Sequence, residues 1–574
     1  MEVFRDTAFG HLVRLITKTK FRQLQYQEEY DSDVWQKYNT GEVPQTPEAH
    51  RQTETWEDGY KSGNYDSEID SINCQRPLSE SSFRTLVPGS HEDFELTSRT
   101  RDDIEEGKDV HLVKFLPNDP EDPQNWPLTK KVLVTFQICL LTTGIYFGSS
   151  IYSAGLLDVM RVFHVGQVEA LLGLTLFVAG YGMIWSPLSE IPYLGRNPIY
   201  IGTLFLFVVL QFPTAMSVNF GMLLAFRFLS GFVGSPVLAT GGATLVDIWS
   251  PQKRAYAIGI WGVAAGSGPT LGPLIGGFVA MEKGWRWPIW ELMWFGGFAF
   301  LVLFFFLPET SASNILYRRT KRLRKLTGNS KLICESERAV LSMSGKDVVK
   351  MTLIRPFTLN FTEPMVFLLN LYIALVYGLL YIWFESFPLV FGEVYHFNIG
   401  LQGLTFLGIL MGSLVALMPY FWYMHNYVEP QFDGNGDIQP EKRLPPAFVG
   451  AFCIPICLFW FGWTARTDVH WIIPIIGSGF FSVGTVLLFN PVLNYLPDAY
   501  PSTAASVLAG NDLFRSSFGS GFPLFANALY NRLGINWASS LLAFIAILFI
   551  PIPFVLYKVG AKLRKNYSKH ARKD

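Results

Sequence analysis

The sequence predicts an all-α membrane protein with twelve transmembrane helices in two six-helix halves, preceded by a disordered acidic arm. Three observations indicate this fold class. Only 16% of the 574 residues are charged and 49% are hydrophobic, whereas a typical soluble domain has about 25% charged residues. The charges also gather near both ends of the chain and in its middle. Between them lie apolar stretches of about twenty residues, the length that a helix needs to cross a bilayer.

Residues 1–25 carry apolar side chains at helical intervals beside basic ones. They contain no unbroken apolar run and no small-residue cleavage site, so they do not match a secretory signal. We expect a short amphipathic helix that rests on the cytoplasmic surface of the membrane. Residues 26–117 form the arm. Because Arg22 to Asp109 includes 21 acidic and 9 basic residues, this segment buries too little apolar surface to fold, and disorder is expected.

Six apolar stretches lie in each of two halves, residues 118–310 and 364–557. They cover approximately residues 132–155, 168–188, 199–216, 220–248, 255–280 and 287–307, and then 364–392, 401–424, 447–463, 471–496, 504–529 and 537–556. A polar connector, residues 311–363, joins the halves, and a basic tail, residues 558–574, ends the chain. Two such repeats predict a substrate site between the halves, near the middle of the bilayer.

Basic residues in the short loops predict the orientation. They gather before the first stretch, between the fourth and fifth, in the connector and in the tail, and are few in the loops on the other side. Because cytoplasmic loops carry an excess of Lys and Arg, both termini are predicted to be cytoplasmic. We expect the plasma membrane, with the vacuolar membrane as the alternative.

The most specific motif lies in the fifth stretch. It consists of Gly259, Gly268, Gly272, Pro273, Gly276 and Gly277. Glycines at steps of four form a flat helix face that a neighbouring backbone can approach closely, and prolines bend the helix. Ordinary small-residue packing explains some of these glycines. The full spacing, however, resembles the antiporter motif of major facilitator exporters.

Other motifs extend this resemblance from Asn118 to the C-terminus. They are Arg227-Phe228-Leu229-Ser230-Gly231 in the fourth stretch, Pro187 to Glu190 followed by Gly195-Arg196, Pro308-Glu309-Thr310, Asp119 to Pro127, and Phe384 to Pro388. Glu190 stands where the superfamily usually has aspartate, and the gap to Gly195 is wider than usual. Together these motifs resemble the fungal drug:proton antiporters of the benomyl, cycloheximide and fluconazole resistance type.

The resemblance implies a major facilitator fold and export of small, mostly apolar drugs, toxins or secondary metabolites by alternating access. The proton gradient would supply the energy, without a cofactor, and the protein would work as a monomer with a small molecule, protons and the bilayer as partners. A dedicated exporter of one endogenous metabolite and a nutrient importer of the same fold remain alternatives. A membrane enzyme is not expected, because the nine histidines form no cluster at one face. The two six-helix halves disfavour a receptor, and the net charge of -1 argues against nucleic-acid binding.

Ionisable groups within apolar stretches need a partner, a cavity or a function. Arg227 has two interpretations: a structural arginine satisfied by backbone carbonyls, or the proton-coupling residue of the family, which would stabilise the charged form of a nearby carboxylate. The second is favoured. Glu385 and Glu291 are the candidate carboxylates, since burial favours proton uptake by a carboxyl group. Glu291 can equally be a solvated residue at the interface. Asp512 and Arg515 share a helix face, and a structural ion pair is the favoured interpretation.

Aromatic and amide side chains are the candidates for the substrate cavity. They are Tyr372, Tyr377, Tyr381, Trp261, Asn370, Asn490 and Asn494. Aromatic rings would suit varied apolar, often cationic compounds, although most aromatics in such a chain are packing residues or interface anchors. The resemblance also makes Glu190, Gly195, Arg196 and Asp247 candidates for a cytoplasmic gate. It implies an ion pair between Arg196 and Asp247, as in similar transporters that are closed to the cytoplasm. The two cysteines Cys453 and Cys457 share a helix face, but no metal site is predicted.

Overall fold

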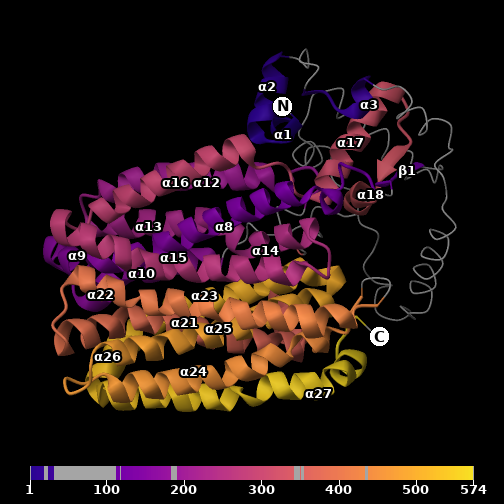
Figure 1. The fold of residues 1–574 in the computed structure, drawn as a ribbon. Helices are drawn as coiled ribbons and strands as arrows, with labels where there is room; N and C mark the ends of the chain where they lie inside the picture. The colour runs from indigo at the N-terminus through magenta and orange to yellow at the C-terminus, as the bar shows by residue number, and fades with distance from the viewer. Residues whose placement is uncertain are drawn as a thin grey trace, which may run out of the picture.

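The computed structural model describes residues 2–17, 24–30, 111–116, 118–182, 191–341, 350, 354–433 and 437–572. The chain forms two layers of long, roughly antiparallel helices (Figure 1). The N-terminal half contains α8 (Leu128–Ser150), η3 (Ile151–Gly155), α9 (Leu156–Phe163), α10 (Gln167–Tyr181), α12 (Asn197–Ala215), α13 (Phe220–Gly234), α14 (Pro236–Ile248), α15 (Arg254–Lys283) and α16 (Trp287–Phe306). The C-terminal half contains α21 (Pro364–Phe387), η5 (Pro388–Val394), α22 (Ile399–Thr405), α23 (Leu407–Tyr423), η6 (Met424–Val428), η7 (Glu429–Gln431), η8 (Pro440–Arg443), α24 (Pro445–Thr464), α25 (Ile472–Ala499), η9 (Pro501–Thr503), α26 (Ala504–Phe549) and α27 (Pro551–Asn566).

Helices occupy all twelve of the predicted apolar stretches. Within the described residues, nine helical segments are long and apolar enough to cross a membrane. The remaining stretches are short or divided: α10 has 15 residues, α13 and α14 meet at Ser235, and α26 contains a break at Gly534, where φ is 73°. The all-α membrane fold in two halves is therefore confirmed, and the number of twelve spans stays a prediction.

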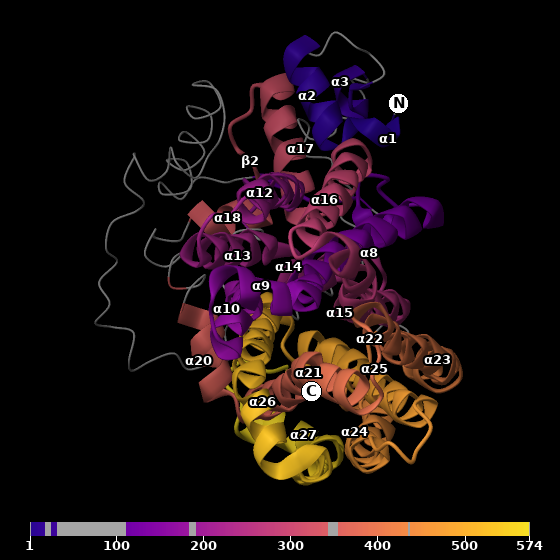
Figure 2. The same ribbon diagram turned by 90° about the vertical axis from the view of Figure 1, so that its left-hand side faces the viewer.

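The halves meet along two seams. In one, α15 of the N-terminal half packs against α22, α23 and α25, and in the other α10 and α14 pack against α26. The view along the helices shows the indigo-to-magenta half above the orange-to-yellow half, with α10 and α26 on one side of the interface and α15 and α22 on the other (Figure 2). Two inter-half seams at the sides leave the middle of the interface for a cavity.

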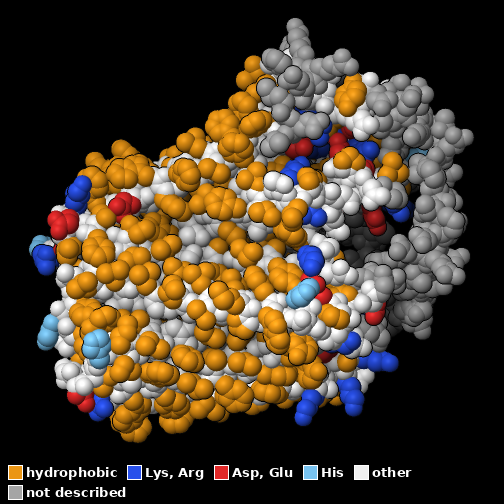
Figure 3. All heavy atoms as spheres, viewed as in Figure 1, with side chains coloured by type: hydrophobic (Ala, Val, Ile, Leu, Met, Phe, Trp, Pro, Cys, Tyr) orange, Lys and Arg blue, Asp and Glu red, His pale blue; other side chains and the backbone are white. Residues whose placement is uncertain are grey.

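A belt of apolar side chains surrounds the helices on the face shown in Figure 3, and charged side chains appear at its two ends. Phe298, Leu301, Met418 and Trp422 are among the large apolar residues exposed on the helices, each at more than half of the full value. An exposed apolar surface of this extent marks a membrane-facing protein.

Both termini lie at one end of the helices, which we call the terminal end (Figure 1). Short elements gather there: η2 (Pro123–Asn125), α1 (Glu2–Arg5), α2 (Ala8–Thr17), α3 (Gln27–Tyr30), β1 (His111–Val113), α17 (Ala312–Thr327), β2 (Leu332–Cys334), α18 (Glu335–Leu341) and α20 (Arg355–Thr362). β1 pairs with β2 in parallel, with Leu112 opposite Ile333. α3 and β1 fall within the segment expected to be disordered, so that expectation does not hold for Gln27–Tyr30 and His111–Val113. Residues 31–110 lie outside the described residues.

The N-terminal helices dock on the connector and on α16. Phe9 packs against Phe305, with ring centroids 5.0 Å apart. Arg322 of α17 pairs with Glu28 at 2.6 Å and covers the ring of Tyr26 at 3.6 Å. Burial and the guanidinium of Arg318 lower the pKa of His11 to about 4. The predicted amphipathic helix is thus present as α2. The contact of Phe9 with Phe305 and a hydrogen bond between Arg318 and His11 hold it against α16 and the connector.

The C-terminal tail docks on the other half of the same end. His570 Nδ1 lies 3.0 Å from Glu363 Oε1, and Arg564 forms two hydrogen bonds of 2.9 Å with Glu441. Burial raises the pKa of Glu363, but hydrogen bonds from Ser568, His570 and the backbone N–H of Lys569 outweigh it and lower that pKa. The tail is therefore tied to the start of α21.

Candidate transport site between the two halves

The glycines of α15 lie against neighbouring backbones on both sides of the helix. A Cβ atom on Gly268 would lie 2.8 Å from the carbonyl oxygen of Thr143, and one on Gly272 would lie 1.9 Å from Ser150 Oγ and 2.7 Å from the backbone nitrogen of Ile151. These contacts pack α15 on α8. On the other side, Cβ atoms on Gly259 and Gly277 would lie 2.9 Å from a Phe421 ring carbon and 2.8 Å from the Ile399 carbonyl oxygen. The same helix therefore forms part of the inter-half seam, and only residues without a side chain fit this spacing.

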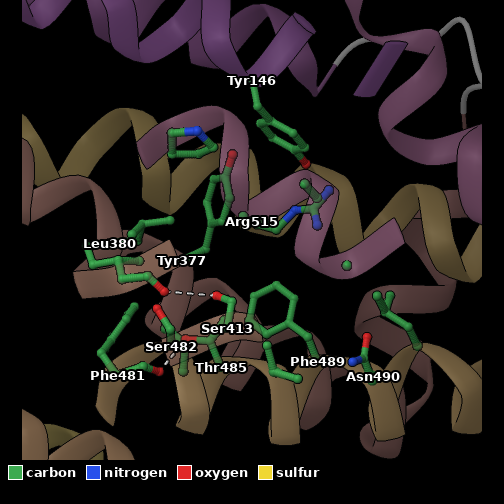
Figure 4. Close-up of a pocket in the computed structure, with 18 of the residues that line it drawn as sticks. Tyr146, Tyr377, Leu380, Ser413, Phe481, Ser482, Thr485, Phe489, Asn490 and Arg515 are labelled. Atoms are coloured by element: carbon green, nitrogen blue, oxygen red, sulfur yellow. Dashed lines mark hydrogen bonds between the residues drawn. The ribbon is translucent and has the colours of Figure 1, made fainter. Parts of the chain in front are cut away.

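A cavity of about 70 Å³ lies between the halves in the middle of the helices. Its described walls come from α8, α15, α21, α23, α25 and α26: Tyr146, Trp261, Gly262, Ala265, Gly266, Pro269, Val376, Tyr377, Leu380, Ile409, Ser413, Phe481, Ser482, Thr485, Val486, Phe489, Asn490, Leu493 and Arg515. Figure 4 shows Arg515 beside the rings of Tyr146 and Tyr377, with Asn490 on another helix. The walls are mostly apolar and aromatic, as expected for a site that binds apolar compounds.

Three of the seven predicted cavity residues line this space: Trp261, Tyr377 and Asn490. The other four, Tyr372, Tyr381, Asn370 and Asn494, lie outside its lining. Asn370 instead belongs to a row of amides, since it accepts a hydrogen bond of 2.8 Å from Asn511 and donates one to Asn360. Tyr372 packs against Phe549, with ring centroids 5.5 Å apart. α21 and α25, which carry these four residues, are buried on more than one face. The spacing of residues along the chain therefore does not indicate which face borders the cavity.

Arg515 was expected only as half of a structural ion pair. The pair with Asp512 is present, at 2.5 Å and with both side chains 6% exposed. Arg515 also lines the central cavity, where its guanidinium carbon lies 5.2 Å from the centre of the Tyr377 ring. The structural interpretation was therefore incomplete, because it left out the position of Arg515 in the cavity.

A second cavity, of about 400 Å³, opens between the halves at the end opposite the termini. Glu385 of α21 and Gln167 of α10 line it together, and Gln167 Nε2 donates a hydrogen bond of 3.2 Å to Glu385 Oε2. Glu385 is only 4% exposed, whereas Glu393 in the same cavity is exposed. A buried carboxyl group therefore joins the two halves beside an open space.

Arg227 is fully buried and bonds to backbone carbonyls. Its Nε donates to Gly173 at 2.9 Å, Nη1 to Gly148 at 2.8 Å and Nη2 to Ser149 at 3.2 Å, and its guanidinium covers the ring of Phe177 at 4.2 Å. Among the described residues, no carboxylate forms an ion pair with Arg227 in this conformation. These contacts match the structural interpretation of Arg227, which links α13 to α8 and α10, and its proton-coupling role stays a prediction.

Glu291 stands apart from these residues. It lies near the start of α16 and is half-buried. It does not line either of the two cavities.

Hydroxyl groups connect the buried residues across the interface. The Tyr381 hydroxyl shares a hydrogen bond of 2.9 Å with Ser149 Oγ and accepts one of 3.2 Å from Tyr377. Ser149 provides a carbonyl to Arg227, and Tyr381 lies one helical turn from Glu385. A contiguous set of contacts therefore joins the cavity residue Tyr377 to Arg227.

At the terminal end, the predicted pair of Arg196 and Asp247 is present at 2.8 Å. Gly195 precedes it with φ of 75°, and a Cβ atom there would lie 2.5 Å from Glu309 Oε2. Glu309 accepts hydrogen bonds from the backbone N–H groups of Arg196 and Asn197, at 3.0 and 3.2 Å. Glu190 lies outside the described residues. Gly195 is therefore needed both for its backbone conformation and for the approach of Glu309.

Ion pairs between the halves close the terminal end, and sequence reasoning missed them. Arg254 of α15 pairs with Asp498 of α25, which also accepts a hydrogen bond of 2.5 Å from Arg443 Nε. Lys253 pairs with Glu429 at 2.8 Å. The pair of Arg443 and Asp498 repeats, in the second half, the pair of Arg196 and Asp247 in the first. Comparing the basic residues before corresponding helices of the two halves is the signal that could have found it.

The model of the Major Facilitator Superfamily matches residues 138–522, which is most of the chain. The chain belongs to this superfamily. It is 47% identical over 463 residues to "Transporter mfs1" of Schizosaccharomyces pombe, covering 79% of this chain and 87% of the relative. It is 43% identical over 460 residues to "Fluconazole resistance protein 1" of Saccharomyces cerevisiae, covering 79% and 83%. It is 40% identical over 467 residues to "Cycloheximide resistance protein" of Candida maltosa, covering 79% and 84%.

A solved major facilitator structure shares the fold. The human organic anion transporter MFSD10 (TETRAN) aligns with a TM-score of 0.50 and 16% identity, covering 75% of this chain and all of that one. At this identity the likeness concerns the fold alone. As a superfamily member, the chain is a transporter embedded in a membrane, with small molecules as substrates.

Proposed function

We propose that this major facilitator protein exports small, mostly apolar compounds in exchange for protons by alternating access. Its relatives include a fluconazole resistance protein, a cycloheximide resistance protein and a multidrug transporter. The observation that carries the proposal is the asymmetry of the interface. A buried ion pair and a partly exposed one join the halves at the terminal end, while the opposite end holds an open cavity with a buried carboxyl group.

The terminal end is assigned to the cytoplasm from its basic loops, so this conformation is closed to the cytoplasm. Opening to the cytoplasm requires the contact between Arg254 and Asp498 to break, because the two residues belong to different halves. The pairs of Arg196 with Asp247 and of Arg443 with Asp498 lie within one half each, and can persist during the movement. The motion is then a rocking of two rigid halves around the central cavity.

Glu385 is assigned as the proton site. It faces the outer cavity, from which a proton can reach it, and its hydrogen bond to Gln167 joins the halves at that end. A proton on Glu385 changes this inter-half contact, since a neutral carboxyl both donates and accepts hydrogen bonds. Arg227 acts indirectly: it holds Ser149, which contacts Tyr381 one turn below Glu385. Protonation and movement of the halves are thus coupled through α21.

We place the protein in the plasma membrane as a monomer, with both termini in the cytoplasm. A dedicated exporter of one endogenous metabolite would have the same gate and the same proton site. The breadth of exported compounds separates that alternative from multidrug export.

The test is efflux from yeast cells that lack their own drug pumps and express this chain. Cells are loaded with benomyl, cycloheximide or fluconazole, and efflux is measured with and without a protonophore. We expect protonophore-sensitive efflux that Glu385→Gln abolishes and Glu393→Gln, the exposed carboxyl in the same cavity, retains. Efflux that persists with the protonophore, or that Glu385→Gln leaves intact at equal surface expression, would overturn proton-coupled export.

A further inference from the structure

The central cavity contains polar atoms that no described residue satisfies. Arg515 is 5% exposed, and its Nε has no hydrogen-bond partner within the described part of the chain. Asn490 is 1% exposed, and neither its side-chain nitrogen nor its oxygen has a partner there. Both residues line the same cavity. Because a buried polar group without a partner is costly, two such groups in one cavity indicate that a ligand supplies their partners.

The surroundings of Arg515 orient this donor. Its Nη2 is bonded to Asp512 Oδ1 at 2.5 Å, and the rings of Tyr377 and Tyr146 lie 5.2 and 6.0 Å from its guanidinium carbon. The ion pair and the rings fix the plane of the guanidinium group, and Figure 4 shows the group directed toward Tyr146 beside the cavity. Arg515 Nε is thus a hydrogen-bond donor with a fixed direction, and a carbonyl oxygen of a ligand could accept its hydrogen bond.

Gly262 of α15, in the N-terminal half, leaves space for the side-chain amide of Asn490. A Cβ atom on Gly262 of α15 would lie 2.7 Å from Asn490 Oδ1, so a glycine is needed opposite this amide. Asn494, one turn further along α25, donates a hydrogen bond of 2.8 Å to the Asn490 carbonyl and does not line the cavity. Asn490 therefore differs from its neighbour in being directed to the space between the halves.

The charge of the walls disfavours a cationic ligand. Arg515 is the one charged side chain among the described residues that line the cavity. Its partner Asp512 lies in a smaller neighbouring pocket, so a ligand in the cavity meets the guanidinium before it meets the carboxylate. The ion pair therefore turns its positive end toward the cavity, and no carboxylate among the described lining residues faces it, so the site disfavours a permanent cation. The aromatic walls alone would have suited cations, which is the expectation from the sequence.

We propose that Arg515 and Asn490 are specificity residues that select neutral apolar substrates carrying carbonyl-type hydrogen-bond acceptors and reject permanently cationic ones. This inference rests on the proposed export function, since it concerns the substrate class of the same cavity. Arg515 Nε donates to one acceptor of the substrate. The Asn490 amide binds a second polar atom, and the aromatic rings cover the apolar body.

Two matched dyes test the proposal. One is a 4-amino-1,8-naphthalimide with an N-butyl chain, a neutral compound whose imide carbonyls are acceptors. The other is the same dye with a trimethylammonium-propyl chain. Binding to the purified full-length protein in lipid nanodiscs is measured by dye fluorescence, and export of each dye is measured in the yeast cells described above. We expect the neutral dye to bind at least about tenfold more tightly than the cationic dye.

Three variants separate the roles of the two residues. Arg515→Lys keeps the positive charge but removes Nε, so we expect about tenfold weaker binding of the neutral dye and continued rejection of the cation. The double variant Arg515→Gln with Asp512→Asn removes both charges and should allow the cationic dye to bind. Asn490→Ala should weaken binding of the neutral dye severalfold, whereas Asn494→Ala, the matched control on the same helix, should not.

Equal binding of the two dyes to the wild type, absence of binding of either dye, or unchanged binding of the neutral dye in Arg515→Lys would overturn the proposal. Failure of the export function has a different signature: selective binding to the purified protein without protonophore-sensitive export from cells. Variants are compared only when their elution as monodisperse protein matches the wild type.

Discussion

Arg254→Gln is expected to open the terminal end without unfolding it. The side chains of Arg254 and Asp498 are 9% and 12% exposed and join the two halves, so the substitution removes a buried charge-assisted hydrogen bond from the closed conformation. Asp498 keeps its contact with Arg443 at 2.5 Å and is not left unpaired. Such a bond stabilises the closed conformation by about 1.5–3 kcal/mol. Because 1.4 kcal/mol corresponds to a factor of ten, the fraction open to the cytoplasm should rise about 10- to 150-fold.

Labelling of a cysteine inside the cavity measures this fraction. Ser413→Cys places a thiol in the cavity wall, at a position 6% exposed, in a chain whose five native cysteines are replaced. A membrane-impermeant maleimide is added to inside-out vesicles, and the labelling rate follows the open fraction. The control is Lys253→Gln, whose side chain is 52% exposed. An exposed ion pair contributes about 0–1 kcal/mol to the stability of the closed conformation. Its loss should therefore raise the open fraction by a factor of about five at most. An equal change of the labelling rate in both variants would refute the role assigned to the buried pair of Arg254 and Asp498.

Three further predictions concern other parts of the chain. Gly272→Ala should lower the thermal stability of the purified protein by the equivalent of about 1–3 kcal/mol, because its Cβ would lie 1.9 Å from a neighbouring hydroxyl oxygen; Gly297→Ala, with no atom within 4 Å, should not. Docking of the N-terminal helices should weaken about tenfold between pH 7.5 and 5.5, because docking lowers the pKa of His11 from about 6.5 to about 4. The contribution of neutral His11 to the docked state is complete above pH 6.5 and declines as the pH falls toward 4. Limited proteolysis should show the loss, and His11→Gln should abolish the pH dependence. A nitroxide at Leu15, which is 79% exposed on α2, should be more accessible to oxygen than to a polar nickel complex in nanodiscs; the reverse would show that this face is in water.

The two-half helical architecture could be predicted because each helix that faces lipid must be apolar for about twenty residues. The glycine spacing of α15 likewise predicted close packing, since only glycine permits the approach seen at Gly272. The pair of Arg196 and Asp247 was predicted through the family resemblance and is present. In each case the relevant signal lies within one helix, or between a loop and the end of a nearby helix.

The inter-half contacts could not be predicted in the same way. Arg254 and Asp498 are far apart in the chain, and the packing of the halves alone brings them together. The cavity position of Arg515 was missed because α26 has no distinct polar and apolar faces, so its pattern does not show which face borders the cavity. Docking of α3 on Arg322 was missed for another reason: the acidic composition of the arm predicted disorder along its whole length, whereas a few residues at each end form specific contacts.

Proton exchange in proteoliposomes tests the central claim most directly. The purified full-length protein is reconstituted with a pH-sensitive dye inside the vesicles, and the neutral naphthalimide is added outside. We predict that entry of the naphthalimide is accompanied by proton release from the vesicles. Glu385→Gln should abolish the proton movement while the naphthalimide still binds, and Glu393→Gln should behave as the wild type. Substrate movement without proton movement in the wild type, or equal proton exchange in Glu385→Gln, would contradict proton-coupled export through Glu385.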